Sequence, residues 1–139
     1  MKVAITGATG FLGRYILSQL AAEQHDCRCW YRPQSDRSGL EHVERFVKWV
    51  EGSLGHRQAC EQLVDGCQAL VHAALERPSH VRMAGKEFTP EMALHNISGS
   101  LQLFEAARAA GVKRIVYISS CAVYGKILDD RPLDEQHPL

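Results

Sequence analysis

The chain has 139 residues, 45% of them hydrophobic and 23% charged, which is enough for one domain with a real core. Sixteen basic and sixteen acidic residues give a formal net charge of zero, which argues against a nucleic-acid or membrane partner held by charge. No apolar run is long enough to span a bilayer and the N-terminus has no leader pattern, so we expect a cytoplasmic protein.

The five cysteines and seven histidines show no CxxC or HExxH spacing. An odd number of scattered cysteines is typical of buried thiols in a reducing compartment. We therefore expect neither a disulfide framework nor a metal site.

The first half of the chain alternates short apolar runs with polar or amphipathic stretches. Residues 3–5 predict a buried strand, and residues 11–24 predict a helix whose apolar face carries Leu12, Ile16 and Leu20. A strand at 27–31, a polar loop at 33–40, a strand at 46–50, a short helix at 56–64 and a strand at 69–73 follow.

The second half begins with a polar segment over residues 76–90 and continues with a strongly helical stretch at 92–110. Leu94, Ile97, Leu101 and Phe104 form one predicted face of that helix, and Gly111 is its predicted C-cap. A fifth strand is predicted at 114–119, and residues 125–139 show no clear element. This alternation predicts an α/β fold: a doubly wound, Rossmann-like parallel sheet of about five strands in a single domain, residues 1–139.

Three glycines mark the junction between the first strand and the first helix, in the stretch ITGATGFLG. A phosphate at a helix N-terminus meets free backbone N–H groups and the positive end of the helix dipole. Glycine permits both that close approach and the tight turn from strand to helix. Gly7, Gly10 and Gly13 therefore predict a dinucleotide phosphate loop.

Several motifs recur in order along the chain: TGATGFLG at 6–13, LVHAA at 70–74, Asn96 with Gly99, LFEAA at 103–107, VKRIVYISS at 112–120 and VYG at 123–125. Together they resemble the short-chain dehydrogenase/reductase superfamily, in particular its extended branch, the NAD-dependent epimerase/dehydratase family. The resemblance runs from the first residue to the last.

The resemblance implies site residues. The cofactor-binding residues would be Gly7, Thr9, Gly10, Phe11, Leu12, Gly13, Arg14, Arg32, Ser53, Leu54, Ala73, Ala74 and Asn96. Ser120 matches the catalytic serine, which would hold a substrate oxygen by a hydrogen bond. The 92–110 helix would form a homodimer interface, with the stripe Leu103, Ala106 and Ala110 left exposed in its absence.

The end of the second predicted strand bears on the choice of cofactor. An NAD-binding protein places an acid about 20 residues past the glycines, to accept hydrogen bonds from the ribose. Here Arg32 stands at that place and the nearest acid, Asp36, lies beyond Pro33. Since arginine binds phosphate well, we expect NADP in preference to NAD.

The family's catalytic tyrosine and the lysine four residues after it are missing. Tyr15, Tyr31, Tyr117 and Tyr124 are followed at that distance by Gln19, Ser35, Cys121 and Leu128. We therefore expect the chain to be the N-terminal portion of a longer enzyme, truncated before the helix with Tyr-x-x-x-Lys and before the substrate lobe, and inactive alone.

The longer protein is expected to be an NAD(P)-dependent epimerase, dehydratase or reductase. Its substrate would be a nucleotide sugar or another hydroxylated small molecule. A reductase of ketone or flavonoid-like substrates is a narrower form of that hypothesis. The alternative from another class is a non-catalytic regulatory module that senses NADP(H).

Overall fold

The computed structural model of the chain describes residues 1–77, 89–124 and 134–135. Within them, five strands form one sheet in the order β3-β2-β1-β4-β5, and every neighbouring pair is parallel. The strands are β1 (Lys2–Thr6), β2 (Asp26–Tyr31), β3 (Val47–Glu51), β4 (Ala69–His72) and β5 (Arg114–Tyr117). The predicted doubly wound α/β fold is confirmed.

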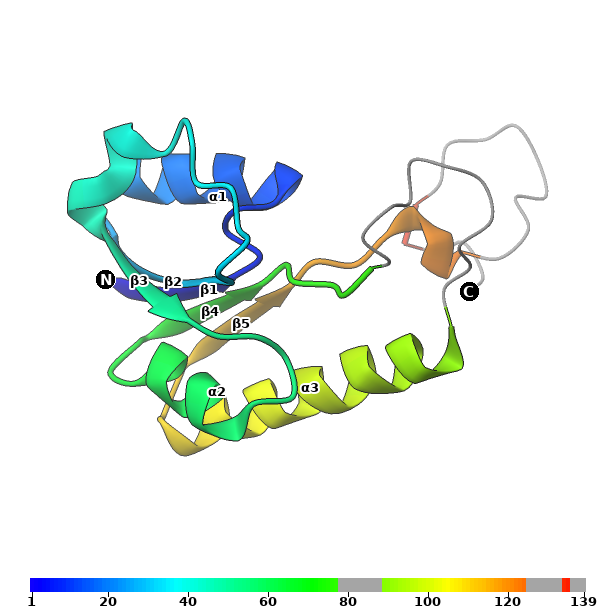
Figure 1. Ribbon diagram of the computed structural model, residues 1–139. Coiled ribbons are helices and arrows are strands. Elements are labelled where there is room, and N and C mark those ends of the chain that lie inside the picture. Colours follow the sequence, from blue (N-terminus) through cyan, green and yellow to red (C-terminus); the bar gives the residue numbers. More distant parts are fainter. Residues whose placement is uncertain (78–88, 125–133, 136–139) are drawn as a thin grey trace.

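In the described part of the chain, three α-helices connect the strands and cover both faces of the sheet (Figure 1). Helix α1 (Phe11–Ala22) lies on one face, while α2 (Arg57–Val64) and α3 (Pro90–Ala109) lie side by side on the other. Because successive strand side chains point to opposite faces, Val3 and Ile5 pack into the core under α1, whereas Ala4 packs into the core under α2 and α3.

Strand β1 lies at the centre, and the chain changes direction around it. It builds β2 and β3 outward on one side, then crosses back to place β4 and β5 on the other. Ligands of such sheets bind beyond the carboxyl ends of the strands, where the strand order reverses. Here that point lies between β1 and β4.

The apolar face predicted for α1 is wrong by one residue. The buried positions are Gly13, Leu17 and Ala21, whereas Leu12 is 45% exposed. The predicted Ile16 and Leu20 are only half-buried at the margin of the core. The cause is Gly13, which packs directly on the backbone of Gly7 and turns its own side of the helix inward.

The two faces predicted for α3 are largely exchanged, although Phe104 of the predicted face is half-buried and packs against the core. Leu94, Ile97 and Leu101 are 67%, 59% and 62% exposed, whereas Leu103 is fully buried and Ala106 is 9% exposed. In the stripe Leu103, Ala106 and Ala110, which was expected to be exposed, only Ala110 is exposed. The physical reason is Gly99, where a Cβ atom would lie 2.7 Å from Cβ of Leu54, so the helix approaches its neighbours on its small-residue side.

The remaining differences are local. A 3-10 helix over Glu41–Phe46 was not predicted, and it takes Phe46 from the expected third strand. Helix α3 begins two residues before its predicted start, with Thr89 as N-cap and Pro90 in the first turn. A second 3-10 helix, Cys121–Val123, follows β5. Most of the polar segments predicted at 76–90 and 125–139 lies outside the described residues.

Candidate functional site

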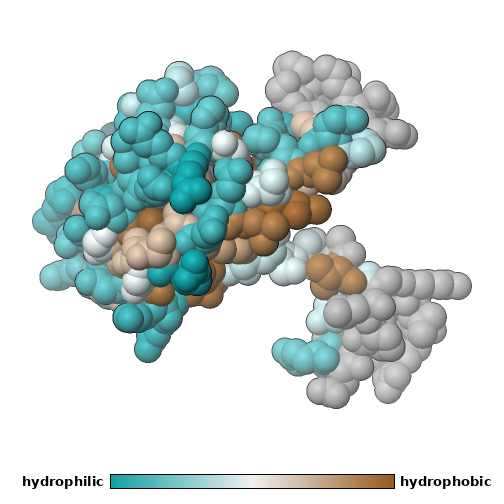
Figure 2. Space-filling view, turned by 90° about the horizontal axis from the view of Figure 1, so that it is seen from below, coloured by the Kyte–Doolittle hydropathy of each residue, from teal (hydrophilic) through white to brown (hydrophobic). Residues whose placement is uncertain are grey.

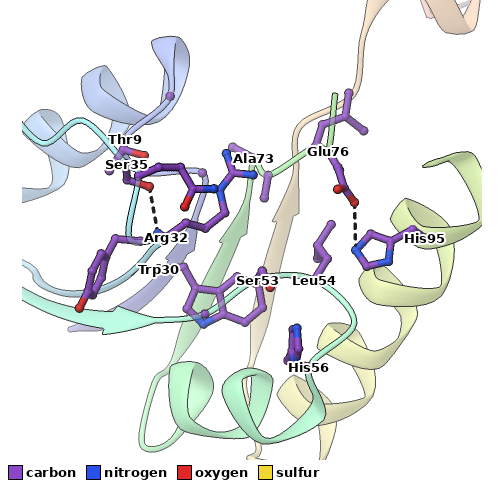
Figure 3. Close-up of a pocket in the computed structure, with 17 residues that line it drawn as sticks. Thr9, Trp30, Arg32, Ser35, Ser53, Leu54, His56, Ala73, Glu76 and His95 are labelled. Atoms are coloured by element: carbon purple, nitrogen blue, oxygen red, sulfur yellow. Dashed lines mark hydrogen bonds and ion pairs between the residues drawn. The ribbon is translucent and has the colours of Figure 1, made fainter. Parts of the chain in front are cut away.

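A cleft of about 480 Å³ opens at the carboxyl ends of four strands (Figure 3). The loop after each strand contributes to its wall. The lining residues are Gly7, Thr9 and Gly10 after β1; Trp30, Tyr31, Arg32, Gln34 and Ser35 from β2 and its loop; Gly52, Ser53, Leu54 and His56 after β3; and Ala73, Ala74, Leu75, Glu76 and, from α3, His95. The cleft thus occupies the place where the strand order reverses, and its volume suits a small-molecule ligand.

The three glycines of the first loop have different structural roles. Gly7 has φ +73° and a Cβ atom there would lie 2.7 Å from the carbonyl group of Ala73, so the loop and the end of β4 touch through backbone. Gly13 packs on the backbone of Gly7. Gly10 has φ −79°, and its missing Cβ would meet only the Gly7 carbonyl oxygen, at 3.2 Å. Gly10 therefore leaves space on the cleft side.

The start of α1 fits the phosphates of a dinucleotide. Gly10 is the N-cap, and neither a side-chain cap nor an acidic residue of the first turn occupies the helix start. The backbone N–H groups of Phe11, Leu12 and Gly13 have no acceptor within the helix. They and the helix dipole favour an anion at this place, and the space at Gly10 lets the anion approach them. The residues at the start of α1 therefore fit the pyrophosphate of a dinucleotide cofactor.

The loop after β2 presents one cation to the cleft. The Arg32 side chain extends into the cleft, while its backbone N–H donates to Ser35 Oγ at 2.9 Å (Figure 3). Among the described residues that line the cleft, the only carboxylate belongs to Glu76, on the far wall. The end of β2 therefore offers a positive and not a negative group.

Arg14, a predicted cofactor-binding residue, does not line the cleft. Its guanidinium donates to the carbonyl oxygen of Thr9 at 3.0 Å and to the carbonyl oxygens of Asp36 and Ser38. The pKa of Asp36 is lowered by a hydrogen bond with the Ser38 side chain, by the Ser38 N–H that donates to its carboxylate, and by the nearby Arg14 charge. Arg14 thus fastens the loop after β2 to the glycine loop, and Asp36 is held away from the cleft.

The loop after β3 forms the wall opposite the glycine loop. Gly52 is required there, because a Cβ atom would lie 2.5 Å from Nε1 of Trp30. The Trp30 indole is 4% exposed and donates to the carbonyl oxygen of Ala59 at 3.3 Å. Ser53, Leu54 and His56 continue this wall, as Figure 3 shows.

The loop after β4 is fastened to α3. Asn96, 7% exposed, accepts from the Glu76 N–H at 2.7 Å and donates to the Glu76 carbonyl oxygen at 3.0 Å. The neighbouring His95 Nε2 lies 3.1 Å from a carboxylate oxygen of Glu76. Asn96 therefore holds the cleft wall from behind and does not itself line the cleft.

The structure brings most of the predicted site residues together. Eight of them line the cleft: Gly7, Thr9, Gly10, Arg32, Ser53, Leu54, Ala73 and Ala74. Phe11, Leu12 and Gly13 stand beside it as the start of α1, and Arg14 and Asn96 support its loops. Ser120, the predicted catalytic residue, is exposed just after β5 and is outside the cleft lining.

Sequence reasoning missed several lining residues, among them Trp30, His56, Glu76 and His95. The position of Trp30 near the end of β2 could have indicated it, because the cleft is lined by residues at the carboxyl ends of strands. Nothing in the sequence pairs Glu76 with His95.

Two further classes of site find no support in the described parts of the chain. There, no group of three or more His, Cys, Asp or Glu side chains gathers around a point where an ion could sit. The same residues include no helix with the length and apolar character needed to cross a membrane.

The fold and the cleft together define a Rossmann-like domain of the dinucleotide-binding class. The chain belongs to the NAD dependent epimerase/dehydratase family, whose model matches residues 3–139. This confirms the resemblance found in the sequence.

Individual relatives have several activities. Over its whole length the chain is 32% identical to a 4-hydroxy-2-methyl-3-oxo-4-farnesyl-3,4-dihydroquinoline-1-oxide ketoreductase of Stigmatella aurantiaca, of which the match covers 39%. Over 94% of its length it is 34% identical to a dTDP-glucose 4,6-dehydratase of Mycobacterium tuberculosis, with 40% of that protein covered. The chain thus spans about two fifths of the length of these curated relatives.

A solved structure shows the same arrangement. The dTDP-glucose 4,6-dehydratase DesIV from Streptomyces venezuelae, which has NAD bound, matches with a TM-score of 0.81 at 27% identity. The match covers all of this chain and 45% of DesIV.

Proposed function

We propose that the chain is the dinucleotide-binding portion of an NAD(P)-dependent epimerase, dehydratase or reductase. The observation that carries the proposal is the uncapped start of α1, with Gly10 beside it, at the point where the strand order reverses. The substrate class we propose is a nucleotide sugar or a similar hydroxylated small molecule, which agrees with the sugar-nucleotide dehydratases among the relatives. The helix with Tyr-x-x-x-Lys and the substrate lobe would belong to a longer protein.

In the proposed complex, each described loop has one task. The N–H groups of Phe11 and Leu12 bind the pyrophosphate, and Gly10 lets it approach them. Ser53 offers a hydroxyl near the adenine, with Leu54 beside it, and the backbone of Ala73 and Ala74 supports the cofactor from the β4 side. Ser120 donates a hydrogen bond to a substrate oxygen. The nicotinamide, when bound, exchanges a hydride with the substrate.

We propose NADP as the preferred cofactor, because Arg32 is the charged group at the end of β2 and Asp36 is held elsewhere. Two charge-assisted hydrogen bonds from a guanidinium to the 2′-phosphate would favour NADP by roughly ten-fold or more. The related DesIV structure has NAD bound, so the preference for NADP has to be measured in this chain.

Calorimetric titration with NADP and NAD tests both proposals. We expect tighter binding of NADP, an equal affinity for both in Arg32→Ala, and an unchanged preference in Arg37→Ala. Arg37 is the matched control because its guanidinium lies 4.9 Å from the Tyr31 ring centre, on the same loop but outside the cleft lining. Equal binding by the unaltered chain would overturn the NADP preference. If circular dichroism shows that the chain is folded and it still binds neither NADP nor NAD, the dinucleotide proposal is overturned.

The alternative is a non-catalytic module that senses NADP(H). The residues of the longer protein would discriminate the two: a Tyr-x-x-x-Lys motif there favours the enzyme, and its absence favours the sensor. A full-length protein with measurable hydride transfer, abolished in Ser120→Ala, would exclude the sensor. Dinucleotide binding without turnover in that protein would favour it.

We also propose a homodimer formed through α3. The exposed face carries Leu94, Ile97 and Leu101, and an apolar surface of this kind is typical of an interaction site. Figure 2, which views the molecule from the side of α2 and α3, shows apolar patches among a largely hydrophilic surface.

We also propose a cytoplasmic location. All five cysteines are free and four of them are buried thiols, which is typical of proteins in a reducing compartment.

A further inference from the structure

A buried histidine connects three elements behind the cleft. His72, the last residue of β4, is 1% exposed. Its Nδ1 lies 2.6 Å from Oγ1 of Thr6 on β1, and its Nε2 lies 2.9 Å from Oγ of Ser100 on α3. The rings of Phe104 and Tyr117 cover it, with centres 5.6 and 5.4 Å away.

The partners of this histidine fix the position of its proton. Ser100 donates its only hydroxyl hydrogen to the carbonyl oxygen of Asn96 at 2.6 Å, one helical turn back. Its oxygen must therefore accept from His72, which places the ring proton on Nε2. Burial lowers the pKa of His72 to about 4, so the ring is neutral at pH 7 and its Nδ1 is an acceptor.

The same logic continues on the other side of the ring. With Nδ1 bare, Thr6 donates its hydroxyl hydrogen to His72. The Thr6 oxygen then accepts from the Ala74 N–H at 3.1 Å. Every donor is used once, in a single direction: from the Ala74 peptide through Thr6, His72 and Ser100 to the backbone of α3. We call this chain of hydrogen bonds the His72 relay.

The relay ends on the wall of the cleft. Ala73 and Ala74 line it, whereas Thr6, His72 and Ser100 do not. Ala73 is also the backbone that Gly7 touches, and its N–H donates to the Thr6 carbonyl oxygen at 3.2 Å. The position of the Ala73–Ala74 peptide relative to the glycine loop therefore depends on groups that a ligand in the cleft never contacts.

We propose that His72, as the neutral Nε2–H tautomer, is a positioning residue for the dinucleotide cleft and couples helix α3 to the backbone of Ala74. The coupling to affinity rests on the proposed dinucleotide function, whereas the relay itself does not. Removing the Ser100 hydroxyl frees the Nε2–H group, loosens the imidazole and displaces the Ala74 peptide.

The test compares Ser100→Ala with Ser98→Ala. Ser98 is the matched control because it lies on α3, is exposed, and its hydroxyl also donates to the backbone one turn back, to His95. Nitrogen NMR of the ring gives the tautomer, and the Ala74 amide resonance reports the peptide. We expect the Nε2–H tautomer at pH 7, a shift of the Ala74 amide in Ser100→Ala only, and NADP or NAD binding about two- to ten-fold weaker in Ser100→Ala only.

A second pair protects the test against a variant that misfolds. Thr6→Val removes the hydroxyl, and Thr6→Ser restores it. We expect a shifted Ala74 amide in the first and near-native values in the second.

Three results would overturn the proposal: a protonated or Nδ1–H His72 at pH 7, identical behaviour of the two serine variants, or no rescue by Thr6→Ser. If the unaltered chain binds neither dinucleotide, the proposed function fails, and the tautomer and the Ala74 amide still decide on the relay.

Discussion

The side chain of Asn96 pairs with the backbone of Glu76 on both sides, accepting from its N–H at 2.7 Å and donating to its carbonyl oxygen at 3.0 Å. A second amide hydrogen bond, to the Met92 carbonyl oxygen at 2.8 Å, holds the amide against its own helix. A buried side chain thus holds the backbone of the segment after β4.

Replacing Asn96 by alanine should therefore affect stability and the cleft together. The part-buried Glu76 backbone loses both partners, at a cost toward the lower end of the roughly 1–3 kcal/mol of an unsatisfied buried group. We expect Asn96→Ala to lower the free energy of unfolding by that amount in urea titrations and to weaken dinucleotide binding. The exposed Gln102→Ala on the same helix is the control and should change neither. Native stability in Asn96→Ala would contradict this role.

Gly7 of the glycine loop can be compared with Gly111, which follows α3, because the two residues have nearly the same φ. Gly7 and Gly111 have φ of +73° and +75°, but a Cβ atom at Gly7 would clash with Ala73, whereas at Gly111 nothing lies within 4 Å. Gly111→Ala should lose about 1 kcal/mol of unfolding free energy, from backbone strain alone. Gly7→Ala should lose clearly more and abolish dinucleotide binding. Equal losses would mean that the contact with Ala73 relaxes freely.

Gly10 should separate folding from binding. Its φ of −79° suits any residue, and its only close neighbour is the Gly7 oxygen, at 3.2 Å. We expect Gly10→Val to keep most of the native thermal stability and to lose dinucleotide affinity by at least about ten-fold, since the side chain would take the place of the pyrophosphate. Unchanged affinity measured by calorimetry would place the phosphates elsewhere.

His72 should give stability a pH dependence. Its folded pKa of about 4 lies below the ordinary value of 6.5, so the unfolded chain binds more protons between these pH values. Stability is therefore retained above pH 6.5 and is lost as the pH falls toward 4, by at most about 1.4 kcal/mol per pH unit. Urea unfolding at pH 7 and pH 5 measures the loss. A non-titrating His72→Asn variant should show a smaller difference between the two pH values, and an equal difference would argue against this account.

The exposed face of α3 should control self-association. Sedimentation velocity is expected to show a dimer that dissociates on dilution, because Leu94, Ile97 and Leu101 present an uncovered apolar stripe. Ile97→Glu and Leu101→Glu should give monomers, whereas Gln102→Glu should not. A monomer at every concentration in the unaltered chain would rule out this interface.

The strands and the glycine loop could be predicted because they depend on local pattern. Apolar runs such as 3–5 and 69–72 favour strands, and glycines between a strand and a helix favour a tight turn that approaches other backbone closely. The helix faces were harder, because apolar residues occur on both sides of α1 and α3. Small residues decided the outcome: Gly13 and Gly99 packed inward because they allow close approach, and larger side chains such as Leu94 were left outside.

The site shows the same division. Residues on the glycine loop could be named from spacing alone, but the pairs His95 with Glu76 and Thr6 with His72 join segments 19 and 66 residues apart. No local pattern encodes such contacts. Arg14 illustrates the opposite error, since a cation next to the loop resembles a phosphate ligand until its three carbonyl partners are seen.

The wall of the cleft is assembled from the loops after four different strands, so no part of the chain forms it alone. A molecule that touches all four loops binds the folded chain and not the unfolded one, and so acts as a folding ligand. At a hundred times its dissociation constant it would add about 2.7 kcal/mol to stability. The amount of folded protein in a cell would then depend on the concentration of the dinucleotide. At a low concentration more of the chain would be unfolded and open to proteases.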